Sequence, residues 1–316
     1  MMQGWQPLQD GDIVDIIAPG WATEPQVLKS SLEFLESWNL KGRVPKNFFK
    51  KNLTASNTDE ARWSHLQAAL QAKDSKVIWC LRGGYGSLRL LPYLEKMKKP
   101  LKAKLLIGIS DITSLHNYLN HQWLWPSLHG VLLDRLGQKD LVSLKIKKEM
   151  KDLLWGKATE VTFKKLKPLN LAAKKIRQIK APVVGGNLAT LQASLGTPYE
   201  FDLQNKFLFL EDIGERGYKL DKMLVHFQQA GKFKNCRGIL LGHFTHGDEP
   251  NGKNLVKKSL ITWAHESKVP VFSGIESGHH INLRPVPFMT SATLSNNSDF
   301  QIVIQTGVID TGVSAQ

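Results

Sequence analysis

The segment that most constrains the fold is LLIGISDITSLHNYL at 105–119, where a short apolar run gives way to a helical pattern at Ser110. A strand that turns into a helix at a serine lifts the hydroxyl above the end of a sheet. It also leaves the first backbone N–H groups of the helix free to face an anion. Nucleophilic serines of several hydrolase folds are mounted in this way, but Ile112 replaces the last glycine of G-x-S-x-G, which disfavours an ordinary α/β-hydrolase. Taken alone, the pattern is also that of a helix N-cap.

A second segment of the same kind lies just upstream. The apolar run VIWCL at 77–81 is followed at once by RGGYGSLRLLPYL at 82–94. Its glycines can place backbone N–H groups at a second sheet end, where they would cradle phosphate or supply oxyanion donors. The spacing fits neither the dinucleotide nor the P-loop motif, so a nucleotide site has little support. A tight turn without a ligand is the alternative.

Strand and helix patterns alternate along the chain, which predicts an α/β fold with a parallel sheet and helices on both faces. The 316 residues suit two domains. We expect a helix at 138–155 to close the first domain, and a hairpin to end the second. The predicted divisions are an N-terminal domain at 1–163, a basic linker at 164–180, and a C-terminal α/β or β-rich domain at 181–316.

Composition limits the partners. The net charge is +14, and seven of the basic residues lie between Lys164 and Lys180 without an acidic one. No nucleic-acid-binding motif accompanies them, so solvated surfaces explain them more simply than a nucleic-acid partner. Cys80 and Cys236 fit buried thiols in a reducing compartment. Neither a secretory signal nor an apolar run of membrane-spanning length is present, which favours a soluble cytoplasmic protein without a membrane partner.

Two sets of acidic and histidine residues in the C-terminal half are candidates for chemistry. One is a metal site; its members lie in loops and lack a helical HExxH motif, so a metal is disfavoured. The other is a serine triad of Ser110, His279 and Glu211. Glu211 and Asp212 are neighbours at a strand end, so alternation sends them to opposite faces and only one can reach the histidine. The residues of the metal alternative are His243, His246, Asp248, Glu249 and His279.

Seven segments occur in the order found in the LD-carboxypeptidases, the S66 serine peptidases, and the chain resembles this family over nearly its whole length. The family includes murein tetrapeptide carboxypeptidases and microcin C immunity hydrolases. The segments are GDIVDIIAPG, RGGYGSLRLLPYL, IGISDITSLHNYL, LHGVL, GGNLATLQASLGT, LFLEDIGERGYKLDKML and GHHINLRPVPFM.

The resemblance implies a catalytic triad of Ser110, Glu211 and His279 in a homodimer that needs no metal or organic cofactor. It implies that the N-terminal domain is the nucleophile domain, and that the C-terminal domain carries the glutamate and the histidine. It further implies that backbone N–H groups form the oxyanion hole; these correspond to Asp111 and Gly84, with Tyr85 at the substrate. The implied reaction is release of D-alanine from murein tetrapeptide in cytoplasmic peptidoglycan recycling. Hydrolysis of an aminoacyl-nucleotide toxin, as in the immunity proteins, is the alternative.

Two assignments stay open at this point. His280 directly follows His279, so the base could be either histidine. A carboxypeptidase must also hold a free carboxylate, which a bidentate arginine would do best. Arg82, Arg89 and Arg284 lie within or beside the quoted segments, and the sequence assigns none of them to this task.

Overall fold

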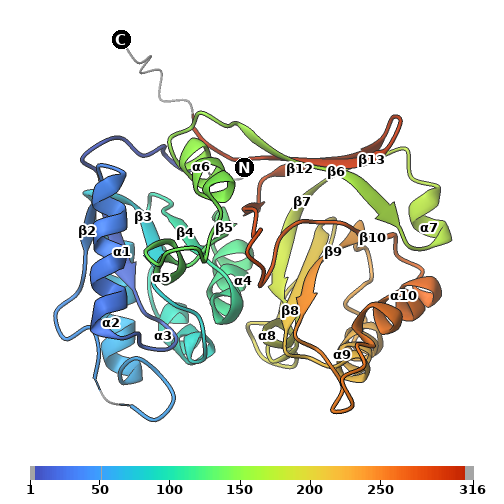
Figure 1. Ribbon diagram of the computed structural model, residues 1–316, viewed down its shortest axis with the longest axis horizontal. Helices are drawn as coiled ribbons and strands as arrows, with labels where there is room; N and C mark the ends of the chain where they lie inside the picture. The colour runs from blue at the N-terminus through green and yellow to red at the C-terminus, as the bar shows by residue number, and fades with distance from the viewer. Residues whose placement is uncertain (1–3, 51, 310–316) are drawn as a thin grey trace.

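The computed structural model describes residues 4–50 and 52–309. It consists of two lobes side by side, one built on an open sheet with helices and the other on a closed barrel (Figure 1). The predicted two-domain α/β fold, with an N-terminal parallel sheet and a β-rich C-terminal domain, is therefore confirmed.

The first lobe contains a six-stranded sheet in the order β11-β5-β4-β3-β1-β2. Its first five strands by sequence are parallel, and β11 runs antiparallel to β5. The strands are β1 (Ile13–Ile17), β2 (Lys41–Arg43), β3 (Ser75–Cys80), β4 (Leu105–Gly108), β5 (Ser127–His129) and β11 (Val286–Phe288). The helices beside it are α1 (Pro25–Ser37), α2 (Asp59–Gln71), α3 (Leu91–Glu95) and α4 (Thr113–Gln122), with 3-10 turns η1 (Ser87–Leu90) and η2 (Ser110–Ile112).

The helix expected at 138–155 is shorter and begins later. One helix lies within these bounds, α6 (Leu144–Leu154), and a short helix α5 (Leu133–Leu136) ends before them. Asp140 adopts a left-handed φ of 61°, which an α-helix does not accept. Ser143 then caps α6, since its hydroxyl accepts the Ile146 N–H at 3.4 Å. The predicted helix is therefore present, but its start was placed six residues too early because Ser143 is the N-cap.

The second lobe is a closed barrel in the order β10-β6-β13-β12-β7-β8-β9. The terminal hairpin predicted from the sequence is confirmed by the antiparallel pairing of β12 with β13. The strands are β6 (Glu160–Pro168), β7 (Gln178–Asn187), β8 (Phe207–Ile213), β9 (Gly238–Thr245), β10 (Val271–Ser273), β12 (Ser291–Asn296) and β13 (Phe300–Gln305). The helices are α7 (Leu171–Lys174), α8 (Leu188–Gln192), α9 (Gly217–Gln229) and α10 (Val256–Glu266).

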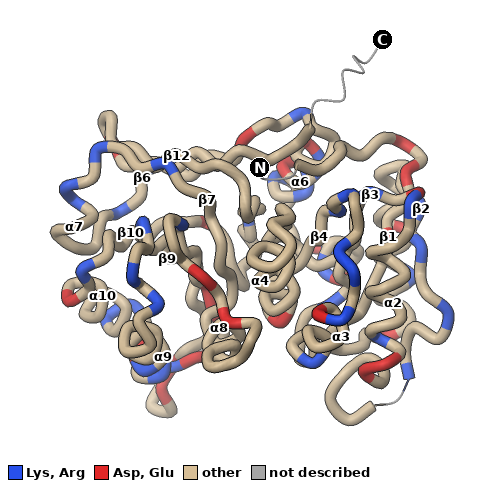
Figure 2. The backbone as a smooth tube through the Cα atoms, turned by 180° about the vertical axis from the view of Figure 1, so that it is seen from behind, with Lys and Arg blue, Asp and Glu red and all other residues tan. Residues whose placement is uncertain are grey.

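The segment 164–180, expected to be a basic linker, belongs to the barrel instead. It contains the end of β6, all of α7 and the start of β7. The reason is a bulge in β6: Lys165 has a φ of 56°, and Lys164 and Lys165 are both exposed where alternation would bury one. The bulge interrupts the alternation of buried and exposed residues by which a strand is recognised in a sequence. Figure 2 shows basic residues of this segment around β6 and α7.

The polypeptide passes between the two lobes more than once. Strand β11 leaves the second lobe and adds to the edge of the first sheet, where Val286 pairs with His129. Near the other end of the chain, Trp5 forms an isolated bridge with Val308. The first sheet is therefore completed by residues that follow the barrel strands β6 to β10 in sequence.

Candidate active site

Ser110 occupies a sharp turn at the carboxyl end of β4. It has a left-handed φ of 71°, which a residue other than glycine adopts only when its surroundings impose it. Gly108 is required two residues earlier, because a Cβ there would lie 2.8 Å from the side chain of Ile112. Ile112, the residue that departs from the G-x-S-x-G motif, thus occupies the space next to Gly108. The turn has the geometry expected of a nucleophilic serine.

The glycine-rich turn after β3 packs directly on Ser110. A Cβ at Gly83 would lie 3.0 Å from the Ser110 Cβ and 3.3 Å from its Oγ, so only glycine fits without a shift. Gly84 has a φ of 101° and lies under the Trp21 ring. Tyr85 follows, with 45% of its surface exposed. The backbone of the turn therefore packs closely against the serine, and the Trp21 ring covers Gly84.

Asp111 ties this turn to the serine. Its buried carboxylate accepts the Ser87 N–H at 2.8 Å through Oδ2, and burial raises the pKa of Asp111. The Asp111 N–H lies in the first turn of η2, where helical N–H groups have no earlier carbonyl to bind. The side chain of Asp111 thus links the residue after Ser110 to the loop at 83–87.

Glu211 and His279 form a close pair in the second lobe. The His279 Nδ1–H donates to Glu211 Oε2 at 2.7 Å, and the His279 backbone N–H donates to the same oxygen at 3.2 Å. Glu211 is fully buried. Burial lowers the pKa of His279, but the charge of Glu211 and its hydrogen bond raise it by more, so the net shift is upward. This arrangement leaves Nε2 as the ring nitrogen that can accept a proton.

Side-chain alternation along β8 decides which carboxylate meets the histidine. Phe207 and Phe209 belong to one buried cluster, whereas Leu208 and Leu210 belong to another on the opposite face. The side chain of Glu211 lies on the same face of β8 as the two phenylalanines. The Asp212 carboxylate lies on the opposite face.

Asp212 holds the turn after β7 rather than the histidine. It accepts the Asn187 side-chain N–H and the Ala189 backbone N–H, both at 2.9 Å. Burial, together with the nearby charge of Glu211, raises the pKa of Asp212 to about 6. Asp212 is thus a structural acid that anchors the start of α8.

His280 has a different environment from His279. Its ring stacks on His243, with ring centroids 4.6 Å apart, and its Nδ1 accepts the Asn282 N–H at 3.2 Å. Only His279 of the two is bonded to Glu211. The geometry therefore favours His279 as the base.

Contacts at the lobe boundary connect the serine turn with the strand of Glu211. Thr113, at the start of α4, accepts the Asn187 N–H at 3.0 Å. Asn187 is the register partner of Glu211 across β7 and β8. Thr113 and Asn187 were not among the residues predicted for the site. The signal in the sequence was the glycine pair before Asn187, which resembles the glycine pair at 83–84.

The residues proposed for the alternative metal site make other contacts instead. Asp248 accepts the Asn254 side chain at 2.9 Å, Glu249 lies 3.6 Å from Arg216, and His279 is bonded to Glu211. Within residues 4–50 and 52–309, no three His, Cys, Asp or Glu side chains gather closely enough to hold a metal ion.

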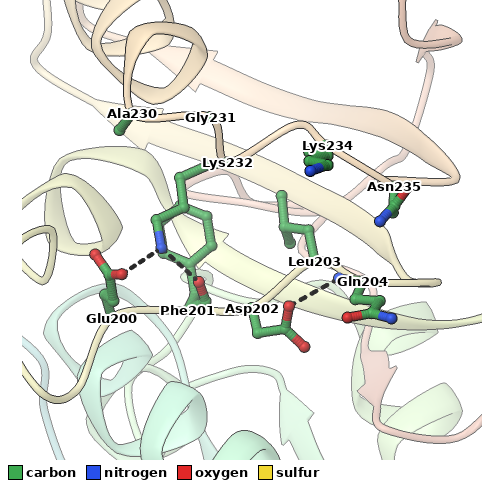
Figure 3. A pocket seen from close by; sticks show the side chains of 10 residues that line it. All are labelled: Glu200, Phe201, Asp202, Leu203, Gln204, Ala230, Gly231, Lys232, Lys234 and Asn235. Carbon is green, nitrogen blue, oxygen red and sulfur yellow. Dashed lines mark hydrogen bonds and ion pairs between the residues drawn. The ribbon is translucent and has the colours of Figure 1, made fainter.

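One surface hollow lies apart from these residues (Figure 3). Its charges are largely neutralised: Lys232 pairs with Glu200 at 2.7 Å and bonds the Phe201 carbonyl at 3.3 Å. None of Ser110, Glu211 and His279 lines it. Its lining residues are Glu200, Phe201, Asp202, Leu203, Gln204, Ala230, Gly231, Lys232, Lys234 and Asn235.

Comparisons with known proteins match both halves of the chain to one family. The LD-carboxypeptidase N-terminal domain matches residues 14–130, and the LD-carboxypeptidase C-terminal domain matches residues 180–294. A putative carboxypeptidase of Rickettsia conorii is 33% identical over 294 residues, covering 92% of this chain and 90% of that protein. The chain belongs to the LD-carboxypeptidase family. The family resemblance inferred from the sequence is thereby confirmed.

Other members of the family have more specific names. The murein tetrapeptide carboxypeptidase of Pseudomonas aeruginosa is 29% identical over 304 residues, covering 93% of this chain and 96% of its own. The crystal structure of muramoyltetrapeptide carboxypeptidase from Oxalobacter formigenes superposes with a TM-score of 0.78 at 24% identity, covering 93% of this chain and 98% of that one. The structure of MccF in complex with glutamyl sulfamoyl guanosine superposes with a TM-score of 0.82 at 18% sequence identity. The match covers 96% of this chain and 98% of that one. At these identities the structural likeness shows the fold.

Proposed function

We propose that this LD-carboxypeptidase family member is a serine carboxypeptidase that releases terminal D-alanine from murein tetrapeptide. The observation that carries the proposal is the 2.7 Å hydrogen bond between His279 and buried Glu211, in a lobe whose Asn187 bonds the helix that follows Ser110. A hydroxyl, an imidazole and a carboxylate are the groups that serine-dependent acyl transfer needs.

In the proposed mechanism, His279 Nε2 takes the proton of Ser110 while Oγ attacks the carbonyl on the L side of an L,D peptide bond. The oxyanion forms beside the backbone N–H groups of Asp111 and Gly84. One such donor contributes about 10²–10³ in rate. His279 then returns the proton to the leaving D-alanine amine, and water attacks the acyl-enzyme. Glu211 stays ionised and holds the imidazole with its proton on Nδ1.

The substrate and the biological role rest on the relatives. Proteins 29–30% identical to this chain are named murein tetrapeptide carboxypeptidase and probable murein peptide carboxypeptidase. A murein tripeptide product would return to cell-wall synthesis, so we propose a role in cytoplasmic peptidoglycan recycling, carried out by a homodimer. Among the described residues, no helix combines the length and apolar character needed to cross a bilayer.

Mass spectrometry of the products tests the reaction directly. The enzyme is incubated with murein tetrapeptide, with pentapeptide and with an aminoacyl-nucleotide, and each mixture is followed over time. We expect tetrapeptide to lose one D-alanine, and Ser110→Ala to abolish that loss while the circular dichroism spectrum stays unchanged. Turnover that persists in Ser110→Ala would remove this serine from the mechanism.

The second candidate is an immunity-type hydrolase of an aminoacyl-nucleotide. The observation in its favour is the exposed ring of Trp21, which lies over Gly84 and offers a surface for stacking a base. Cleavage of the aminoacyl-nucleotide with tetrapeptide left intact would establish this alternative.

A further inference from the structure

Two of the three arginines near the quoted segments are committed to structural ion pairs. Arg284 donates through Nε to both oxygens of Glu149 at 3.0 Å and through Nη1 to the Thr162 carbonyl at 3.0 Å. Arg89 donates through Nε to Asp59 at 2.7 Å. Guanidinium groups held in this way have few N–H groups left for a substrate.

Arg82 is held far more loosely. Its closest ionic partner in the described part of the chain is Asp134, with Nε and Oδ2 4.0 Å apart, too far for a hydrogen bond. The Arg82 side chain is 43% exposed. The next residue, Gly83, packs on Ser110, and the preceding residue, Leu81, accepts the Asp134 N–H at 3.0 Å. Arg82 therefore lies one residue from the contact with the candidate nucleophile, with most of its donors available.

A second arginine belongs to the same cluster. Arg135 follows Asp134 on α5, is half-buried, and has no carboxylate within 4.0 Å among residues 4–50 and 52–309. Arg135 and Asp134 are neighbours on α5, and the charge of Arg135 acts to lower the pKa of Asp134. Asp134 thus has two guanidinium groups in its surroundings, and neither makes an ion pair with it closer than 4.0 Å. The cluster carries a net positive charge when Asp134 is ionised.

The carboxylate of Asp134 also lacks close partners. It is 7% exposed, and its Oδ1 has no hydrogen-bond partner in the described part of the protein. Burial raises the pKa of Asp134 to about 6, although Arg82 and Arg135 act in the opposite direction. An anion that draws both guanidinium groups together beside Asp134 would complete the charge balance.

We propose that Arg82, assisted by Arg135, binds the free terminal carboxylate of the peptide substrate, and that Asp134 positions the two guanidinium groups. This inference rests on the proposed function. In a departing D-alanine, one carbon atom separates the carboxylate from the scissile nitrogen, so its receptor must lie close to the nucleophile. Arg82 meets this requirement because the next residue, Gly83, packs on Ser110. A planar guanidinium also matches a carboxylate better than an ammonium does. The enzyme would accordingly act only on unblocked chain ends.

Binding without turnover tests the receptor directly. In the Ser110→Ala background, calorimetry compares murein tetrapeptide with the same peptide carrying a terminal carboxamide. We expect the acid to bind about 10- to 100-fold more tightly than the amide, as for charge-assisted hydrogen bonds. Adding Arg82→Ala should weaken binding of the acid to the level of the amide and leave the amide unchanged. Equal binding of acid and amide in Ser110→Ala would overturn the proposal.

Three further variants separate recognition from folding. Arg89→Ala is the matched control, because it removes a nearby arginine that pairs with Asp59, and it should keep the preference for the acid. Arg82→Lys should restore part of the preference, and Arg135→Gln should reduce it. Melting temperatures identify any variant that fails to fold. If Arg82→Ala and Arg135→Gln both fold and both retain the full preference, the assignment is wrong.

Turnover distinguishes this proposal from the proposed function. With the wild-type serine, Arg82→Ala should raise KM for the acid more than it lowers kcat. If the wild-type enzyme cleaves no peptide, the proposed function fails, and the acid preference measured by calorimetry still decides whether Arg82 is a carboxylate receptor.

Discussion

Replacing Glu211 by glutamine tests the pair with His279 most directly, because it keeps the shape of the side chain and removes its charge. The same oxygen, Oε2, accepts two N–H groups of His279, at 2.7 and 3.2 Å. An amide oxygen at that position can still accept both. An amide nitrogen there would face two donors, so we expect the glutamine oxygen to take the place of Oε2.

This geometry sets the size of the effect. The histidine keeps its proton on Nδ1, so the loss is that of one charge-assisted hydrogen bond, about 1.5–3 kcal/mol, or about 10- to 150-fold in kcat/KM. It is well short of the roughly 10⁴-fold expected when the wrong tautomer forms. The new amide nitrogen would lie where Oε1 has no hydrogen-bond partner among the described residues, which should lower stability as well.

The pH dependence supplies the second measurement. Glu211 raises the pKa of His279 against the effect of burial. Glu211→Gln should therefore lower the pKa of His279 and move the acid limb of the kcat/KM profile to lower pH. Because the folded-state pKa of His279 is raised, the pair stabilises the fold below the unfolded pKa, about 6.5, and this stabilisation is lost as pH rises through the folded value. The substitution should thus reduce the melting temperature more at about pH 5 than at about pH 8.

Steady-state kinetics of Glu211→Gln between about pH 5 and 9, with circular dichroism at each pH, would decide the matter. A kcat/KM within about threefold of wild type together with an unshifted acid limb would refute the pairing as a source of catalysis.

The other predictions concern single contacts. Gly83→Ala should greatly reduce turnover at little cost in melting temperature, because its Cβ would lie 3.0 Å from the Ser110 Cβ; full activity would show that the turn yields easily. His280→Ala should lose the stack on His243, about 0.5–1.5 kcal/mol of stability, and keep its activity, whereas His279→Ala should lose about 10³-fold or more; the reverse result would reassign the base. Dialysis against EDTA should leave D-alanine release unchanged, and inhibition at full stability would revive the metal alternative.

Local features of the sequence predicted the local features of the site. The strand, turn and helix around Ser110 follow from an apolar run, a small residue at Gly108 and a helical pattern, all within one segment. The division of Glu211 and Asp212 between two faces of β8 follows from alternation.

Long-range features could not be predicted in this way. The three residues of β11 carry no signal that they join the first sheet, because pairing across about 160 residues depends on the whole fold. A bulge at Lys165 concealed β6, and the left-handed Asp140 lies before the true start of α6. The proposal for Arg82 depends on the ion pairs of Arg89 and Arg284, which join residues far apart in the sequence.

Strand β11 has a consequence for how this enzyme can be divided or rearranged. It begins seven residues after His279 and is hydrogen-bonded to β5, so the loop that carries His279 is connected directly to the sheet whose strand β4 precedes Ser110. A fragment comprising only the first lobe would present β5 as an open edge, which invites pairing with other copies. Fragment expression or domain exchange in this family should therefore transplant β11 together with the N-terminal lobe.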